Sequence, residues 1–227
     1  MTRRGTGQLA LDLKSWGGKR ARAGRKPATE KARMPHDARP MLASRHPVHA
    51  TVRVLPEIGD LREVKRFRIV RASIASGRDR LGFRIVQFDV QRTHVHLIVE
   101  AKDKDVLARG MRGLQVRIAH ALNALLGRAG RVFEDRYHAR ALKTPLEARR
   151  CLAYVLLNGR HHSSLRGIKS ATLRLDPCSS AAFFDGWKGP VPLADPKDKA
   201  VADAHTWLIR VGWRQWGLIS PDEIPGG

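Results

Sequence analysis

Two histidines separated by one residue, His94 and His96, are the side chains of this 227-residue sequence that most directly suggest chemistry. They fall in the β-rich run 93–99, and alternate side chains of a strand point to the same face, so both imidazoles would project together. Two imidazoles on one face can bind a single divalent cation. The alternative is a pair of ordinary surface imidazoles, because the chain has ten histidines and such triplets also arise at random. The spacing favours a metal-binding pair.

Tyr154 and Asn158 form the second group of candidate functional residues. The preceding segment 144–147, Thr-Pro-Leu-Glu, supplies an N-cap, a proline at the first helical position and a capping-box glutamate, so it predicts the start of a helix. We expect this helix to end near Asn158, with Gly159 just beyond its end. Residues four apart lie on one helix face, so the Tyr154 hydroxyl and the Asn158 amide would point together. The alternative is that Tyr154 is a core residue, as helix tyrosines beside an apolar stripe often are.

Strand patterns occur at four places in the chain. Apolar residues alternate over 48–55, before Pro56, which predicts a half-buried strand. The runs 83–90 and 93–99 are rich in β-branched residues and are joined by a short polar link, as in a hairpin. Segment 131–142 shows little helical periodicity and predicts a further strand.

Two amphipathic helices are predicted between these strands, one from about residue 61 to a stop at Gly77 and one over 105–126. Their apolar stripes are Leu61, Val64, Phe67, Val70 and Ile74 in the first helix, and Leu107, Met111, Leu114, Ile118, Leu122 and Leu125 in the second. The order β-α-β-β-α-β-α predicts an α+β fold of ferredoxin-like type, an antiparallel sheet with helices on one face.

The charge of the chain points to a polyanionic partner. Lys and Arg number 43 against 21 Asp and Glu, so the net charge is 43 − 21 = +22. Basic residues on the outer faces of the two helices are either phosphate contacts or solvated surface. They are Lys65, Arg66, Arg68, Arg109, Arg112 and Arg117.

The composition divides the chain into three parts. Residues 1–46 are basic and lack apolar periodicity, which predicts a flexible arm that either aids solubility or contacts phosphates. Residues 47–164 form the predicted domain, and 165–227 form a Pro- and Trp-rich extension that we expect to pack on it. The two cysteines make no disulfide framework, and no apolar window is long enough for a membrane span, so a cytoplasmic protein is expected.

In this order and architecture, His94-Val95-His96 and Tyr154 resemble the motifs of the single-tyrosine HUH transposases, which include the transposases of the smallest insertion sequences and the REP-associated tyrosine transposases. The resemblance covers about residues 47–162 and includes 131–138, Arg-Val-Phe-Glu-Asp-Arg-Tyr-His, which is similar to the segment before the family's tyrosine helix. The family's third metal ligand, a Gln or Asn, follows the tyrosine by four residues, and Asn158 occupies that place. The chain departs from the family where members often continue Asn-Pro, because here Gly159 follows.

The resemblance implies metal-dependent nicking and strand transfer of single-stranded DNA that carries hairpin or palindromic elements. His94, His96 and Asn158 would hold Mg²⁺ or Mn²⁺, and zinc bound with Cys151 is the less favoured choice. Tyr154 would form a covalent 5′-phosphotyrosine and release a 3′-hydroxyl. The alternative is a domesticated or non-catalytic relative that binds hairpin DNA, or a basic RNA-binding protein. Family members occur as monomers and as homodimers, so both states are compatible with the resemblance.

Overall fold

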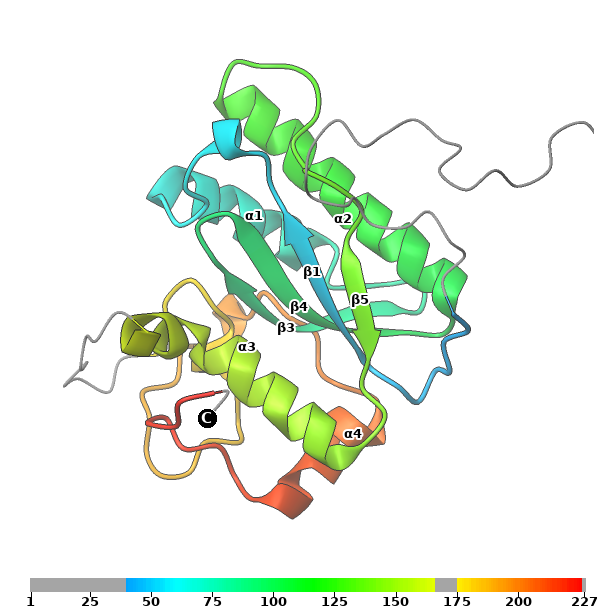
Figure 1. Ribbon diagram of the computed structural model, residues 1–227, viewed down its shortest axis with the longest axis vertical. Helices are drawn as coiled ribbons and strands as arrows, with labels where there is room; N and C mark the ends of the chain where they lie inside the picture. The colour runs from blue at the N-terminus through cyan, green and yellow to red at the C-terminus, as the bar shows by residue number, and fades with distance from the viewer. Residues whose placement is uncertain (1–39, 166–174, 226–227) are drawn as a thin grey trace, which may run out of the picture. The chain divides into compact units, whose positions relative to one another are not determined.

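A five-stranded antiparallel sheet forms the centre of the computed structural model, which describes residues 40–165 and 175–225. The strands are β1 (Val48–Arg53), β2 (Asp79–Arg80), β3 (Phe83–Val90), β4 (His94–Ala101) and β5 (His138–Ala141). Their order in the sheet, β2-β3-β4-β1-β5, places β4 at the centre, between β3 and β1 (Figure 1). The predicted hairpin is confirmed, whereas the last strand is shorter than the predicted 131–142. The predicted arm lies outside the described residues up to position 39.

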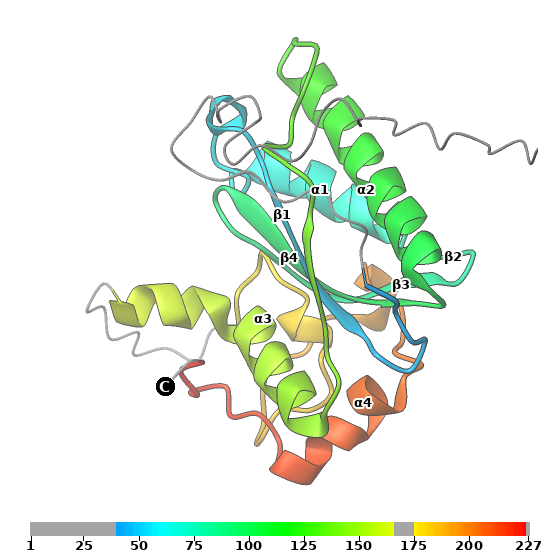
Figure 2. The same ribbon diagram turned by 45° about the vertical axis from the view of Figure 1, so that its right-hand side comes forward.

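The longer helices cover both faces of this sheet (Figures 1 and 2). The helices are α1 (Val64–Ser76), α2 (Lys104–Leu125), α3 (Pro145–Leu165) and the short α4 (Trp207–Arg210). One core joins α1 and α2 to one face, and a second core joins α3 and the C-terminal residues to Val86 and Ile98 on the other face. The α+β class is therefore confirmed, while the arrangement of helices on one face holds for α1 and α2 only. Among the described residues, no helix has the length and apolar character that a membrane span requires.

The apolar stripes of α1 and α2 face the core as predicted except at their ends, with Phe67 partly buried. Val64 is 60% exposed, because α1 begins only at that residue, after Glu63 caps it by accepting a hydrogen bond from the Lys65 backbone N–H. Leu61 is fully buried, but it lies in the preceding turn rather than in the helix. Leu125, the last residue of α2, is 39% exposed, so the prediction that it belongs to the buried stripe is wrong.

Helix α3 begins as predicted but continues beyond its predicted end. Thr144 Oγ1 accepts a hydrogen bond from the Glu147 backbone N–H at 3.2 Å, and the Glu147 carboxylate accepts one from the Thr144 N–H at 3.3 Å, which is a complete capping box. Gly159 does not end the helix, which runs on to Leu165. A Cβ at position 159 would lie 2.8 Å from Oδ2 of Asp176, so the glycine allows a close approach of that carboxylate instead of a left-handed turn.

The C-terminal residues are part of this folded unit. Residues 178–180 pair with the outer edge of β3, where the Val90 N–H donates to Cys178 O and the Ser180 N–H donates to Phe88 O, each at 2.9 Å. The buried Glu100 carboxylate accepts hydrogen bonds from the backbone N–H groups of His205 and Thr206. The remaining elements are short 3-10 turns at Pro56–Ile58, Ala181–Phe183, Pro196–Asp198 and Gly212–Trp216.

We expect Trp213→Ala to destabilise the whole described unit by about 3–5 kcal/mol, because a buried tryptophan is lost and its cavity does not fully collapse. Trp213 is 1% exposed and packs on Phe184, with ring centroids 5.4 Å apart. The measurement is urea unfolding followed by circular dichroism. Trp207→Ala, at a site that is 53% exposed, is the matched control with a smaller loss. A separate early transition in Trp213→Ala, with the main transition unchanged, would show that the C-terminal residues fold independently.

Candidate functional site

Three side chains meet around His96 on the face of the sheet that α3 covers. His96 is 5% exposed, and its Nε2 lies 3.1 Å from Nε2 of His94, the other member of the predicted pair. The two imidazole rings are nearly perpendicular, with centroids 4.7 Å apart. Strand alternation thus places both imidazoles on one face, with their Nε2 atoms close enough to share a ligand. This part of the predicted site is brought together as expected.

Tyr154 approaches the same pair from α3. Its hydroxyl lies 3.5 Å from His96 Nε2, and the two rings meet edge to face with centroids 5.1 Å apart. The phenol is only partly buried, so it is not the sealed core residue of the alternative interpretation. Burial raises the pKa of Tyr154, and the nearby Asp89 carboxylate raises it further. A phenolate at this position therefore requires a compensating positive charge.

A third imidazole, His49 on β1, was not predicted to belong to the site. Its Nε2 lies 3.2 Å from His96 Nδ1, and Thr51 Oγ1 lies 3.1 Å from the same atom. Burial, together with the charge of Arg140, lowers the pKa of His49 to about 4, so its ring is neutral at pH 7. These two partners hold the His96 ring by Nδ1 and leave Nε2 directed at His94 and Tyr154. The sequence carried a signal, because His49 and Thr51 alternate with the buried apolar residues of the predicted strand 48–55.

Asn158 lies one turn beyond Tyr154 and binds a carboxylate that the sequence analysis missed. Its Nδ2 donates to Oδ2 of Asp89 at 2.9 Å, and Gln91 Nε2 donates to the same oxygen at 2.7 Å. Asp89 is 1% exposed and is the partner of His96 in the β3–β4 register. Burial raises the pKa of Asp89 to about 7, against the lowering effect of these two hydrogen bonds. The available signal was an acidic residue between Phe88 and Val90, near the end of the predicted strand 83–90.

Two buried oxygens at this position have no hydrogen-bond donor among the described residues. They are Oδ1 of Asp89 and Oδ1 of Asn158. An unsatisfied buried acceptor is costly, and a cation relieves that cost. Oxygens beside a pair of imidazoles form a mixed donor set of the kind that Mn²⁺ or Mg²⁺ accepts. Asn158 therefore fits the role of third ligand that the resemblance implies.

The donor set does not resemble a closed zinc site. Within the described part of the chain, no three His, Cys, Asp or Glu side chains are grouped so that they could hold a metal ion, so the site depends on the amide of Asn158. Burial raises the pKa of Cys151 to about 12, which disfavours the thiolate that a zinc ligand must be.

The six basic residues predicted to contact phosphates lie on the opposite face of the sheet from Tyr154, on α1 and α2. Two of them make internal contacts: Arg66 forms an ion pair with Glu63 at 2.8 Å, and Arg117 donates its Nε to Ser73 O at 3.4 Å. Lys65, Arg68, Arg109 and Arg112 are exposed. The structure therefore does not bring these residues to the tyrosine, and their contact with nucleic acid stays a prediction.

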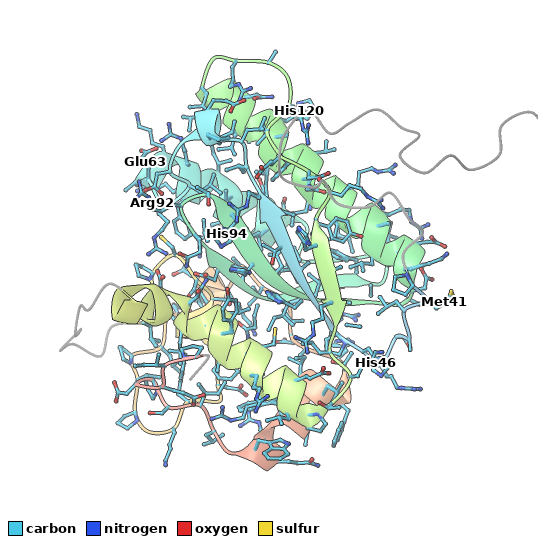
Figure 3. All side chains as sticks on the ribbon, viewed as in Figure 1. Met41, His46, Glu63, Arg92, His94 and His120 are labelled. Carbon is cyan, nitrogen blue, oxygen red and sulfur yellow. The ribbon has the colours of Figure 1, made fainter. Side chains whose placement is uncertain are left out.

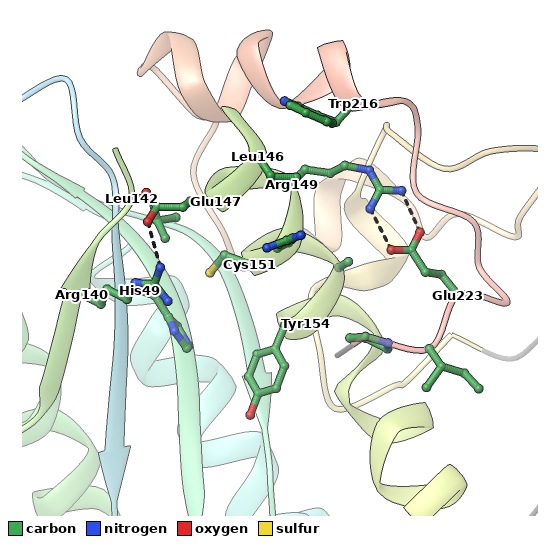
Figure 4. Close-up of a pocket in the computed structure, with 14 residues that line it drawn as sticks. His49, Arg140, Leu142, Leu146, Glu147, Arg149, Cys151, Tyr154, Trp216 and Glu223 are labelled. Carbon is green, nitrogen blue, oxygen red and sulfur yellow. Dashed lines mark hydrogen bonds and ion pairs between the residues drawn. The ribbon is translucent and has the colours of Figure 1, made fainter. Parts of the chain in front are cut away.

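A cavity of about 750 Å³ opens beside Tyr154 (Figure 4). Its walls come from the ends of β1 and β5, from the exposed side of α3, and from the C-terminal residues Trp216 and Glu223. This volume lies within the range of ligand sites in proteins, roughly 300–1,000 Å³.

A scan against models of protein families and a search of curated proteins found no match to this chain. Similar solved structures include a REP-associated tyrosine transposase bound to a REP hairpin, which is 18% identical with a TM-score of 0.47 over 57% of this chain and 74% of that one. Another is a candidate transposase from Deinococcus radiodurans R1, which is 12% identical with a TM-score of 0.34 over 62% of this chain and 100% of that one. Both carry the name transposase.

Proposed function

We propose that this protein is a transposase of the single-tyrosine HUH type, which nicks and rejoins single-stranded DNA through Tyr154. The observation that carries the proposal is the approach of the Tyr154 hydroxyl to within 3.5 Å of an imidazole pair whose Nε2 atoms are 3.1 Å apart. A phenol from α3 and two imidazoles from β4, two distant parts of the chain, meet at one place, and the buried Asn158 amide follows one turn further along α3. A structural role alone does not require this combination.

The residues of the site have distinct roles in the proposed reaction. His94, His96 and Asn158 would hold Mg²⁺ or Mn²⁺, which when bound withdraws charge from the scissile phosphate. The Tyr154 oxygen attacks phosphorus, the bond from phosphorus to the 3′-oxygen breaks, and the strand leaves with a free 3′-hydroxyl. The phenol gives up one proton and the departing 3′-oxygen gains one, so protons balance over the step. The covalent 5′-phosphotyrosine retains the bond energy, so a 3′-hydroxyl can reverse the reaction.

Histidine 49 and Thr51 act as positioning residues for His96. Because both contact Nδ1, they fix the orientation of the ring and keep Nε2 available, as hydrogen-bonded partners of ligating histidines usually do. Asp89 performs the same task for Asn158, because it accepts a hydrogen bond from Nδ2 and so fixes the orientation of the amide.

The proposed partner is single-stranded DNA with hairpin or palindromic elements. The net charge of +22 provides the nonspecific part of the affinity, because Lys and Arg neutralise phosphates whatever the base sequence. We expect strand capture to fall steeply with added salt, whereas the site around Tyr154 decides where the strand is cut.

The test is covalent capture of DNA. Purified protein is incubated with end-labelled single-stranded DNA that carries the short palindromes flanking its own gene, with Mn²⁺, with Mg²⁺, or with a chelator. We expect a labelled adduct that survives denaturing electrophoresis, forms with either metal and disappears with the chelator. Mass spectrometry of the digested adduct should place the phosphate on the peptide that contains Tyr154. Tight DNA binding without an adduct in any metal would instead favour the non-catalytic relative.

A further inference from the structure

We infer that the cavity between α3 and the C-terminal residues binds an unpaired nucleotide of the DNA strand next to the scissile phosphate, with Trp216 as the surface on which its base stacks. This inference rests on the proposed function and adds the chemistry that recognises the strand. It assigns a role to the C-terminal extension, which lies outside the part of the chain that resembles the transposase family.

The cavity has one wall that suits a base. Trp216 is 56% exposed although it lines a cavity, and Ile224, which lines the same cavity, is 54% exposed. Figure 4 shows the indole edge-on above Leu146 and Arg149, at the end of the cavity away from the Tyr154 hydroxyl. An exposed indole in a concave site is a surface for a flat aromatic ligand, and stacking on it tolerates any base.

The charges around the cavity suit a phosphate. Arg140 pairs with Glu147 and Arg149 pairs with Glu223, both at 2.8 Å, so these four groups neutralise one another. Arg150 also lines the cavity, is exposed, and has no carboxylate partner among the described residues. The cavity therefore keeps one uncompensated positive charge, which matches one backbone phosphate.

The backbone that follows Trp216 is held by an arginine of the tyrosine helix. Arg149 forms a two-pronged ion pair with Glu223, with both N–O distances 2.8 Å, and donates its Nε to Gly217 O at 3.1 Å. Gly217 follows Trp216 with a φ of 82°, a left-handed conformation that glycine adopts without strain. The wall is thus formed before any ligand binds, which lowers the entropy cost of binding.

The position of Tyr154 determines which nucleotide the cavity receives. Tyr154 lines the cavity, and its hydroxyl points away from Trp216 (Figure 4). The same hydroxyl lies 3.5 Å from His96 Nε2. When a DNA strand places its scissile phosphate at this hydroxyl, the nucleotide next to that phosphate lies beside the cavity. A nucleotide in a base-paired stem cannot expose its face to the indole, so the cavity selects single-stranded DNA.

The test measures binding of fluorescent oligothymidine by anisotropy, in the presence of chelator so that no cleavage occurs. We expect Trp216→Leu to raise the Kd about tenfold, the effect of losing one stacked base. An abasic strand of the same length should bind the wild type and Trp216→Leu equally. Strands with 5-iododeoxyuridine should crosslink to the peptide that contains Trp216. Circular dichroism should show unchanged folding, because the residue is exposed.

The matched control is Trp207→Leu, because Trp207 is 53% exposed but does not line this cavity. Its Kd for oligothymidine should stay at the wild-type value. Unchanged binding by Trp216→Leu, or an equal loss on the abasic strand, overturns the inference. If wild-type protein forms the Tyr154 adduct while Trp216→Leu binds normally, the nucleotide site is wrong and the proposed function stands. If no adduct forms but Trp216→Leu weakens binding, the cavity binds single strands and the nuclease proposal is wrong.

Discussion

Tyr154→Phe should abolish the covalent adduct, with a fall of at least about a thousandfold in strand cleavage, because the nucleophile is removed and nothing replaces it. The affinity for the same DNA should change by less than about twofold, since phosphate contacts elsewhere supply most of the binding. The measurement is denaturing electrophoresis of the labelled strand alongside an anisotropy titration of intact strand. The phenol is half-buried and its hydroxyl is 3.5 Å from His96, so phenylalanine fits without a cavity.

The chain offers a matched control for this prediction, because it contains only two tyrosines, Tyr137 and Tyr154. Tyr137 is 7% exposed and belongs to the core on the other face of the sheet. Tyr137→Phe should therefore retain the adduct. An adduct that persists in Tyr154→Phe and is lost in Tyr137→Phe would reassign the nucleophile.

His94→Ala should reduce Mn²⁺ affinity and cleavage by at least about a hundredfold, because a ligand of the cation is lost outright. We choose His94 rather than His96 because it is less buried and is not held by His49 and Thr51. The readouts are Mn²⁺ binding without DNA, followed by electron paramagnetic resonance, and adduct formation. DNA affinity measured in chelator should stay near that of the wild type.

His120→Ala is the control for this variant, because His120 is an exposed imidazole on α2, apart from His94 on the sheet (Figure 3). It should bind Mn²⁺ and form the adduct as the wild type does. Equal Mn²⁺ affinity in His94→Ala and the wild type would show that the histidine pair is not a metal site.

The elements and part of the site were predictable because they depend on local patterns. A period of two placed His94 and His96 together, and the capping box fixed the start of the helix that carries Tyr154. The meeting of these distant segments was expected from the resemblance to the transposase family and not from any local pattern, and the approach of Tyr154 to His96 agrees with it. Asn158 lies one turn beyond Tyr154 on the same helix, as its spacing predicted, and its role as a metal ligand stays a prediction.

The errors and omissions arose where a residue's role is set by tertiary contacts. Gly159 is the residue type that usually follows a helix end, yet the helix continues through it, and the missing side chain leaves room for the Asp176 carboxylate. Asp89 and His49 became part of the site only through partners on other strands and helices. The cavity wall around Trp216 depends on an ion pair between residues 149 and 223, which are 74 positions apart. An ion pair between residues so far apart produces no periodic pattern in the sequence, so it could not be predicted from one.

The pairing of residues 178–180 with β3 limits how two copies of this protein can associate. An open strand edge exposes N–H and C=O groups that recruit the strand of a neighbouring molecule. At Phe88 and Val90 those groups are already engaged by the chain's own later residues. A homodimer of the intact chain therefore cannot form by extending the sheet at this edge of β3. In a truncated chain that ends before residue 178, the same edge would be open and could pair with the β3 edge of a second copy.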